Sequence, residues 1–541
     1  MKFKKNFKEH NSYLYIILIA IILFGTKLVL NNLLLAENGD TYDFFKVGYF
    51  IKHGNWDYTS KRMPLLPIFL SFFNPEYFVN AGRVIINTFY FLSVFVFYKY
   101  SNIILKEKVG NTIKEIITSN SFLVTLIFAF NLVIFENSFY ILADTPFLFF
   151  NILFLYVFRK YESFNKASQD VQDILLALIA GLSFYTRPEG LLLFVAYGTY
   201  LLINKKIKQL LKFGILGFIL ITPYFIRNIL IYNKILYSGY LSDEAGFIFN
   251  IQTILLRISN FFFGIGGIWL IPVLYVLFAI TRKNKGFSIK KYGVDSLNIE
   301  TLLFVFYSLV LLAWGPYVRL YTIPISLIII FAFLKIKEIN MSTVSKSNWL
   351  IASFLVLSSI LFYIIVLQKY DQTDLGYRKI GKIMSLLLSF PVIFAFYFFS
   401  INKLSKKYFL IVFSILIIII NIVVFTEKFI ITRYKYSTLK KATEYYMENY
   451  KNNGNLGYDS GSDVETWYTR DFEKKNNYLK SGEDFFKWAK NRNIKYIVTT
   501  QEMGHNDKFI DYIKWNELKH KVLKEYQSPF FYGKTKLIEI E

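Results

Sequence analysis

The stretch YFLIVFSILIIIINIVVF, from Tyr408 to Phe425, has no charged side chain. A second apolar stretch, from Tyr13 to Leu35, has Lys27 as its single charge. At ~1.5 Å of rise per residue, a helix of about 20 residues crosses a hydrocarbon layer of ~30 Å. Since 54% of the 541 residues are hydrophobic, the chain carries more apolar side chain than a soluble core needs. We therefore predict a polytopic α-helical membrane protein.

Apolar runs separated by basic connections predict about thirteen membrane-spanning helices, near residues 13–35, 82–104, 119–135, 144–158, 173–186, 190–203, 212–230, 261–281, 301–315, 318–334, 349–368, 384–400 and 408–426. The first run is longer than the apolar core of a signal peptide and lacks a small-residue cleavage site, so we expect a retained helix. Lysine and arginine gather in alternate connections, which predicts a cytoplasmic N-terminus. Residues 369–383 break this alternation.

The chain has a formal net charge of +24 and contains no cysteine. Most lysines lie in short connections between apolar runs, where they meet the headgroups of membrane lipids and set topology. This distribution argues against nucleic acid as a partner. Because cysteine is absent, disulfide bonds and thiolate chemistry are excluded.

We divide the chain into a transmembrane domain at residues 1–430 and a small extracytoplasmic α/β domain at 437–541. The polar C-terminal region contains an amphipathic stretch at 483–490 and strand-like alternation at 495–500 and 535–540. No repeat of 20–50 residues is visible in the sequence, which argues against a transporter built by internal duplication.

The first outer loop, residues 36–81, places two carboxylates ahead of a basic step. Asp40 and Asp43 come first, and Lys61 and Arg62 follow, just before a Met-Pro pair. A carboxylate beyond a helix end can act as a general base or hold a cation, whereas paired basic groups suit a phosphate. The alternative is that these are ordinary solvated loop charges without a specific role.

Asp144 stands at the start of an apolar run, directly before Thr-Pro, and Glu136 precedes it by eight residues. A carboxylate among membrane helices costs roughly 2.5–3.5 kcal/mol and is tolerated where it lines a cavity or meets a partner. Asp144 is therefore a functional candidate. The alternative is a helix N-cap, because an Asp ahead of Thr-Pro can satisfy the free N–H groups of a helix start.

Three arginines fall near one face of the membrane. Arg187 lies in TRPEG with Glu189, Arg227 lies in PYFIRN, and Arg319 begins RLYTIP, which includes Tyr321. Snorkelling to the interface explains each arginine singly. Together they could neutralise a phosphorylated lipid whose headgroup lies at that depth.

The order of these motifs resembles that of the C-type (GT-C) membrane glycosyltransferases, particularly the branch of protein O-mannosyltransferases, lipid A aminoarabinose transferases and RgtA/B/C/D-like transferases. The resemblance covers nearly the whole chain. Members carry an acidic motif, often Asp-Glu, in the first outer loop, and some carry Lys-Pro-Pro where this chain has Arg62-Met63-Pro64. Here Asp43 is three residues from Asp40 instead of adjacent, so Asp40 is the better candidate for the base.

The resemblance implies transfer of a sugar from a polyprenyl- or dolichyl-phosphate donor to a lipid, glycan or protein acceptor on the outer face of the cell membrane. The catalytic candidates are Asp40, Asp43 and Asp144. The candidates for binding the donor phosphate are Lys61, Arg62, Arg227 and Arg319. Further pocket candidates are Glu136, Arg187, Glu189 and Tyr321.

A lipid phosphate leaves readily near neutral pH, so such an enzyme needs a base for the acceptor hydroxyl and positive charge for the phosphate. Direct attack predicts inversion at the anomeric carbon. Four carboxylates, those of residues 40, 43, 136 and 144, could hold a divalent cation such as Mg²⁺ or Mn²⁺, or the arginines could supply all of the positive charge.

The main alternative is a transporter or flippase for lipid-linked sugars. That function would place charged residues deep within the apolar runs, whereas this chain gathers them at the outer helix ends. A polymerase or ligase of the O-antigen type would lack the acidic pattern in the first loop. A purely structural membrane protein is the remaining alternative.

Overall fold

The computed structural model describes residues 24–233 without 59, 61, 108–112 and 163–165, residues 235 and 254, 298–338 without 315–317, 406–458 without 435, 464–472 without 471, 485–500, 519–528 and 534–540. Three expected membrane helices, near 261–281, 349–368 and 384–400, lie outside these residues, as do Lys61 and the segment 369–383. The total of thirteen helices therefore stays a prediction.

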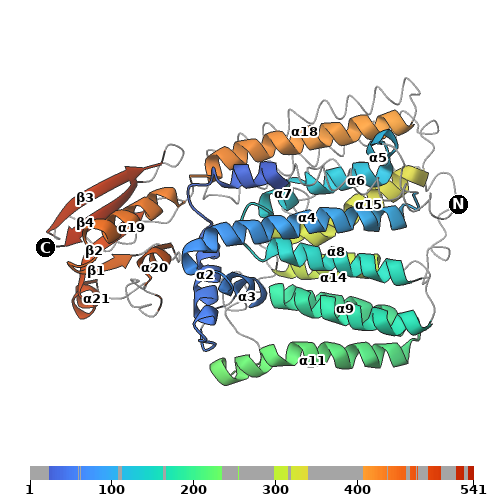
Figure 1. Cartoon of the computed structure of the whole chain (residues 1–541), viewed down its shortest axis with the longest axis horizontal. Coiled ribbons are helices and arrows are strands. Elements are labelled where there is room, and N and C mark those ends of the chain that lie inside the picture. Colours follow the sequence, from blue (N-terminus) through green and yellow to red (C-terminus); the bar gives the residue numbers. More distant parts are fainter. Residues whose placement is uncertain are drawn as a thin grey trace.

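Long helices make up most of the described chain and lie side by side (Figure 1). They are a helix that includes residues 24–31, α4 (Phe78–Ile104), α6 (Asn120–Ala129), α8 (Asp144–Tyr161), α9 (Lys166–Thr186), α10 (Leu191–Ile203), α11 (Ile207–Tyr232), α14 (Ile299–Trp314), α15 (Thr322–Glu338) and α18 (Lys406–Thr432). Shorter helices connect them: α5 (Ile113–Ile117), α7 (Leu132–Asn137), η2 (Pro188–Gly190) and η6 (Val318–Tyr321). By length and composition, Pro75–Ile104 and Ile207–Tyr232 are apolar enough to cross a membrane.

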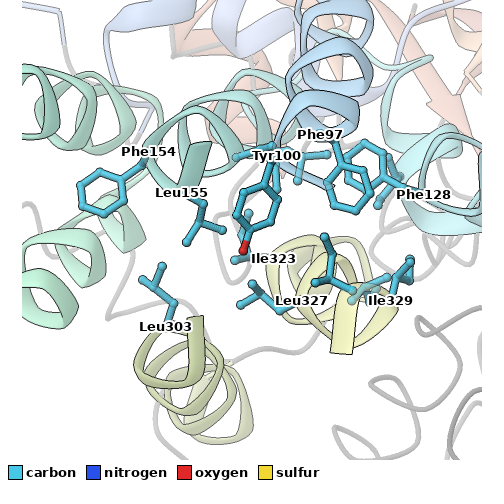
Figure 2. Close-up of a cluster of buried hydrophobic side chains, with 14 of the residues drawn as sticks. Phe97, Tyr100, Phe128, Phe154, Leu155, Leu303, Ile323, Leu327 and Ile329 are labelled. Atoms are coloured by element: carbon cyan, nitrogen blue, oxygen red, sulfur yellow. The ribbon is translucent and has the colours of Figure 1, made fainter. Parts of the chain in front are cut away.

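Aromatic and branched aliphatic side chains fill the space between the helices (Figure 2). Phe97 of α4 stacks on Phe128 of α6 with 3.9 Å between ring centroids, and Ile323 and Leu327 of α15 are buried beside them. Lipid tails are as apolar as these side chains, so helices in a membrane associate through close packing and polar contacts rather than through the hydrophobic effect.

A buried ion pair ties three of these helices together at the end of the array away from α2. The Nε–H and Nη2–H groups of Arg159 in α8 donate to the two carboxylate oxygens of Glu300 in α14, each at 2.6 Å. The hydroxyl of Tyr100 in α4 donates to the same carboxylate at 2.9 Å. These bonds supply the partners that a buried charge requires.

The single helix expected near 119–135 is wrong, because the chain forms two helices there, α6 and α7. The side-chain oxygen of Asn131 accepts hydrogen bonds from the backbone N–H groups of Val133 and Ile134 and so begins a new helix. An apolar run shows how long a segment is, but a single capping residue inside it decides whether the helix continues.

The connection expected at 36–81 contains short helices: α2 (Gly39–Lys52), α3 (Leu65–Ser71) and η1 (Pro75–Tyr77). Asn38 begins α2 by accepting a hydrogen bond from the N–H of Asp40 at 3.1 Å. Asp40 therefore lies in the first turn, where the helix dipole favours a negative charge. In Figure 1, α2 and α3 lie between the helical array and the C-terminal sheet.

The C-terminal region combines helices α19 (Ser437–Asn449), α20 (Val464–Thr469) and α21 (Phe485–Asn491) with strands β1 (Asn455–Tyr458), β2 (Ile494–Thr500), β3 (His520–Gln527) and β4 (Lys534–Ile540). The sheet order is β1-β2-β4-β3, with β1 parallel to β2 and the other pairs antiparallel. The strands expected near 495–500 and 535–540 are confirmed as β2 and β4. Gly457 of β1 is required by close packing, since a Cβ there would lie 2.4 Å from the Trp488 ring.

Candidate functional site

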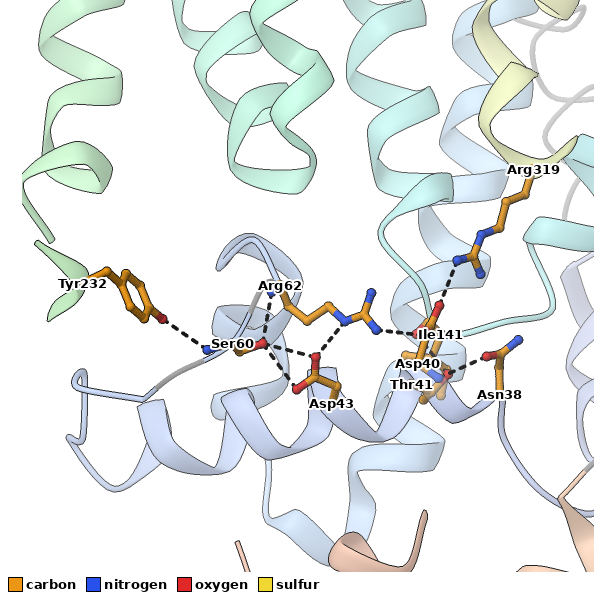
Figure 3. A network of polar contacts seen from close by, with 9 residues as sticks. All are labelled: Asn38, Asp40, Thr41, Asp43, Ser60, Arg62, Ile141, Tyr232 and Arg319. Carbon is orange, nitrogen blue, oxygen red and sulfur yellow. Dashed lines mark hydrogen bonds and ion pairs between the residues drawn. The ribbon is translucent and has the colours of Figure 1, made fainter. Parts of the chain in front are cut away.

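Two carboxylates and two guanidinium groups meet where α2 faces the helical array (Figure 3). Arg62 binds Asp40 at 2.7 Å and Asp43 at 2.8 Å, and Arg319 binds the other oxygen of Asp40 at 2.8 Å. The hydroxyl of Ser60 donates to the Asp43 carboxylate at 3.2 Å. We call these five residues the carboxylate–arginine cluster. The interpretation of Asp40, Asp43 and Arg62 as ordinary solvated loop charges does not hold, because each is bound to a partner.

Helix geometry explains how one arginine reaches both acids. Asp40 and Asp43 are three residues apart on α2, so they lie on the same face of the helix. Arg62 approaches from the segment between α2 and α3, and Arg319 approaches from η6. The GT-C motif has adjacent acids, whereas Asp40 and Asp43 are three residues apart. On an α-helix, this wider spacing places both carboxylates on the same face.

The cluster contains two carboxylates and two guanidinium groups, so its formal charges cancel. The two guanidinium groups determine the protonation state of Asp40. Burial favours the neutral acid, but the charges of Arg62 and Arg319 outweigh it and hold the pKa of the Asp40 carboxyl well below its ordinary value. Asp40 is therefore a carboxylate throughout the neutral range. While both arginines are bound to it, it is also a weak base.

Backbone contacts hold the cluster against α7 and α8. The hydroxyl of Thr41 donates to the carbonyl of Ile141 at 3.2 Å, which joins α2 to the segment before α8. The side-chain amide of Asn137 donates to the carbonyl of Arg319 at 3.0 Å. The arginine of η6 is consequently placed by the end of α7.

Asp144 belongs to a second ionic group. Arg187 binds Asp144 at 2.7 Å and Glu189 at 3.1 Å. The N-cap alternative for Asp144 is wrong, because Asp144 is the first residue of α8, Ala143 precedes it as the cap, and no side chain caps the helix. Two carboxylates share one guanidinium here, so the three side chains carry one net negative charge.

Arg227 lies apart from the carboxylates and contacts the segment that leads to Arg62. Its guanidinium donates to the carbonyls of Trp56 and Tyr58, at 3.1 Å and 2.8 Å, and lies 4.2 Å from the centre of the Tyr58 ring. Burial raises the pKa of Tyr58 to about 12, so its ring stays neutral beside this cation.

The remaining pocket candidates, Tyr321 and Glu136, lie on η6 and on α7. Tyr321 is fully buried in the helical core, and its hydroxyl donates to the carbonyl of Leu311 at 3.3 Å. Glu136 is half-buried in α7, a helix that contacts η6.

The proposed metal site is not formed by the four carboxylates named for it. Among the described residues there is no group of three or more His, Asp or Glu side chains placed to hold a metal ion. Asp40 and Asp43 bind arginines, and Asp144 lies in the other ionic group. These residues do not fit a divalent cation, and we derive no step through one.

Several residues of the site were missed by sequence reasoning. Ser60 and Tyr232 link Asp43 to the end of α11, since the N–H of Ser60 donates to the Tyr232 hydroxyl at 3.2 Å (Figure 3). Asn137 places Arg319. Serine, tyrosine and asparagine are common at helix ends, so nothing in the sequence distinguishes these three.

No family model matches this chain, and no curated protein sequence does either. Two solved structures of ArnT nevertheless share its fold, so the resemblance expected from the motifs is confirmed at the level of the fold. The fold is similar to the crystal structure of ArnT from Cupriavidus metallidurans bound to undecaprenyl phosphate, with a TM-score of 0.62, 8% identity and coverage of 97% of both chains. The apo state of that ArnT matches with a TM-score of 0.62 and 8% identity, over 96% of this chain and 97% of the other.

Proposed function

We propose that this protein is a glycosyltransferase that moves a sugar from a polyprenyl-phosphate donor to an acceptor at the outer face of the membrane. The observation that carries the proposal is the carboxylate–arginine cluster on a GT-C fold. The guanidinium N–H groups that here bind the oxygens of Asp40 and Asp43 can bind the oxygens of a phosphate in the same way. The undecaprenyl phosphate bound to ArnT supports the same class of ligand.

The cluster suggests how donor binding would activate the base. A lipid phosphate that enters between Arg62 and Arg319 competes with Asp40 for both guanidinium groups. Released from them, the buried carboxylate regains proton affinity, because burial alone raises the pKa of an acid. Asp40 would then be basic only when the donor is in place.

In the reaction, the acceptor hydroxyl gives its proton to Asp40 and its oxygen forms a bond to the anomeric carbon. The bond between that carbon and the phosphate oxygen breaks, and the lipid phosphate leaves with the electron pair. Arg62 and Arg319 stabilise its charge, which is electrostatic catalysis by preorganised groups. A single displacement inverts the anomeric centre.

The second ionic group has a different part in this proposal. Asp144 and Glu189 leave one net negative charge beside Arg187, so this group suits hydrogen-bond donors such as sugar hydroxyls better than it suits a phosphate. We assign it to the orientation of the acceptor or of the transferred sugar.

The proposal includes a topology. The N-terminus would be cytoplasmic, residues 1–430 would form the membrane domain, and residues 437–541 would form an extracytoplasmic domain. The cluster, which lies on the side of the array that faces the sheet, would then open to the outer face.

The first test compares wild type with Asp40→Asn in nanodiscs, using radiolabelled polyprenyl-phosphate sugars and a membrane extract as acceptor. Loss of the base should reduce transfer by about 10²–10⁴-fold. Asp57→Asn is the matched control, because Asp57 is an exposed acid in the segment between α2 and α3 and should leave transfer unchanged. Equal transfer by wild type and Asp40→Asn would remove Asp40 from the mechanism. No transfer by wild type from any donor would favour a flippase instead.

A further inference from the structure

Helix α2 presents different chemistry on two of its faces. Asp40 and Asp43 turn toward the carboxylate–arginine cluster. Tyr42, Phe45 and Tyr49, spaced three and four residues apart, form an aromatic face along the same helix. The aromatic face packs against the C-terminal region, so α2 is held between that region and the helical array.

Close ring contacts join the aromatic face to α20 and the residues after it. Trp467 lies 5.0 Å from Phe45 and 5.7 Å from Phe78, with its ring nearly parallel to the Phe78 ring. The hydroxyls of Tyr468 and Tyr42 are 3.5 Å apart. Buried aromatic pairs of this kind each add about 0.5–1.5 kcal/mol beyond their burial.

The far end of α2 is held in the same way. Phe472 lies 4.8 Å from Tyr49 and 6.0 Å from Phe50, ring centre to ring centre. Phe472 also packs against Trp467 at 5.7 Å. One aromatic layer therefore supports α2 over most of its length.

The C-terminal region also contacts the chain immediately before Asp40. The Tyr436 hydroxyl comes so close to Gly39 that a Cβ on that residue would lie 3.0 Å from it. The ammonium group of Lys440 donates to the carbonyl of Leu35 at 3.3 Å. The start of α2 is thus fixed by contacts from Tyr436, the residue just before α19, and from Lys440 within that helix.

We infer that the C-terminal region is a positioning element for the active site, with Trp467 as its central residue, and that it sets where α2 holds Asp40 and Asp43. Trp467 is on the side of α2 opposite to the cluster and acts through the helix. The catalytic meaning of this inference rests on the proposed function. The physical reason is that a helix moves as a rigid body, so loss of support on one face displaces the carboxylates on the other.

The experiment compares Trp467→Ala with Trp488→Ala in the full-length protein. Trp488 is a matched control, since it is an equally buried tryptophan of the same region, but it packs in a separate core with Phe485 and Ile497. The two readouts are hydrogen exchange of the α2 backbone, residues 39–52, and steady-state transfer kinetics.

For Trp467→Ala we expect faster exchange in α2 and a kcat lower by roughly 10- to 100-fold, the effect of a displacement near 1 Å. The KM for the donor should not rise, because Arg62 and Arg319 are carried by segments outside α2 and a displaced Asp40 competes less well with the donor phosphate for them. Trp467→Phe, which keeps a ring, should restore most of kcat. Trp488→Ala should leave both readouts close to wild type at a temperature where it is folded.

Exchange in α2 that is equal for the two alanine variants would overturn the inference, as would an unchanged kcat for Trp467→Ala. The exchange readout needs no substrate, so it tests the inference even if wild type transfers no sugar, an outcome that would refute only the proposed function. If Trp467→Ala does not fold, Phe472→Ala removes the support of Tyr49 and Phe50 and is judged by the same readouts.

Discussion

At the scale of single residues, the two guanidinium groups decide the chemistry of Asp40. Its lowered pKa means that its ion pairs stabilise the fold fully above the ordinary Asp value of ~3.9 and lose that effect as pH falls toward the lowered value. The pH dependence of kcat/KM reflects the pKa values of groups in the free enzyme. Wild type should therefore show no loss of kcat/KM from protonation of Asp40 above about pH 4. In Arg319→Gln, only Arg62 is left to counter the effect of burial, which raises the pKa of Asp40. The acid limb should therefore appear at higher pH than in wild type.

The measurement is kcat/KM against pH for wild type, Arg319→Gln and Arg227→Gln. Arg227 binds backbone carbonyls and serves as the control, because its replacement should leave the acid limb where it is in wild type. Coincident limbs for wild type and Arg319→Gln would mean that Asp40 is not the group whose ionisation controls the reaction.

At the scale of elements, the end of α11 holds the segment that carries Arg62. The Tyr232 hydroxyl accepts from the N–H of Ser60 and donates to the carbonyl of Tyr58. Tyr232→Phe removes both bonds. The Tyr58 carbonyl keeps its bond from Arg227, but the N–H of Ser60 loses the Tyr232 hydroxyl, which should cost about 1–3 kcal/mol of stability. Because Arg62 loses its placement, the KM for the donor should rise severalfold in the same variant.

Tyr185→Phe separates the two effects. Its hydroxyl also bonds a backbone carbonyl, that of Leu220 in α11, but it does so away from the segment of Arg62. Both variants should lower the unfolding temperature in detergent, and only Tyr232→Phe should raise the donor KM. A donor KM that rises equally in both would show that general destabilisation, not the segment, is responsible.

At the scale of the whole molecule, the ion pair of Arg159 and Glu300 fastens the end of the array that lies away from the cluster. Glu300→Gln leaves Arg159 with Glu162, an exposed partner, and should cost about 3 kcal/mol or more, because a buried charge loses its counter-charge. The pair of changes Arg159→Met and Glu300→Met should cost less, since it removes both charges.

Thermal unfolding in nanodiscs measures this difference, and transfer at a temperature well below unfolding is the control. Transfer should survive in both variants because the cluster lies at the other end of the helices. A double variant as unstable as Glu300→Gln would show that removing the acceptor of the Tyr100 hydroxyl costs as much as leaving Arg159 without its counter-charge.

The sequence by itself determined the long apolar helices and the residue types of the site. A run of hydrophobic residues predicts a helix from local sequence alone, without knowledge of its neighbours. The bounds of α4, α8 and α11 could therefore be predicted within a few residues. The acids at 40 and 43 and the arginines at 62 and 319 stood out because charge is rare beside such runs. The same local signal failed at Asn131, where one capping side chain divides a helix, and in the segment 36–81, where α2 and α3 are too short and mixed in composition to stand out.

Only the tertiary structure decided which charges pair and what supports them. Arg319 and Asp40 are 279 residues apart, and Tyr468 lies 426 residues from Tyr42, so no periodicity or spacing connects them. In the sequence, Arg227 and Arg62 are both basic residues at the membrane edge. In the structure, Arg227 binds backbone carbonyls, whereas Arg62 binds two carboxylates. The physical reason is that an ionic group takes its role from the charges within a few ångströms of it, and the fold chooses those neighbours.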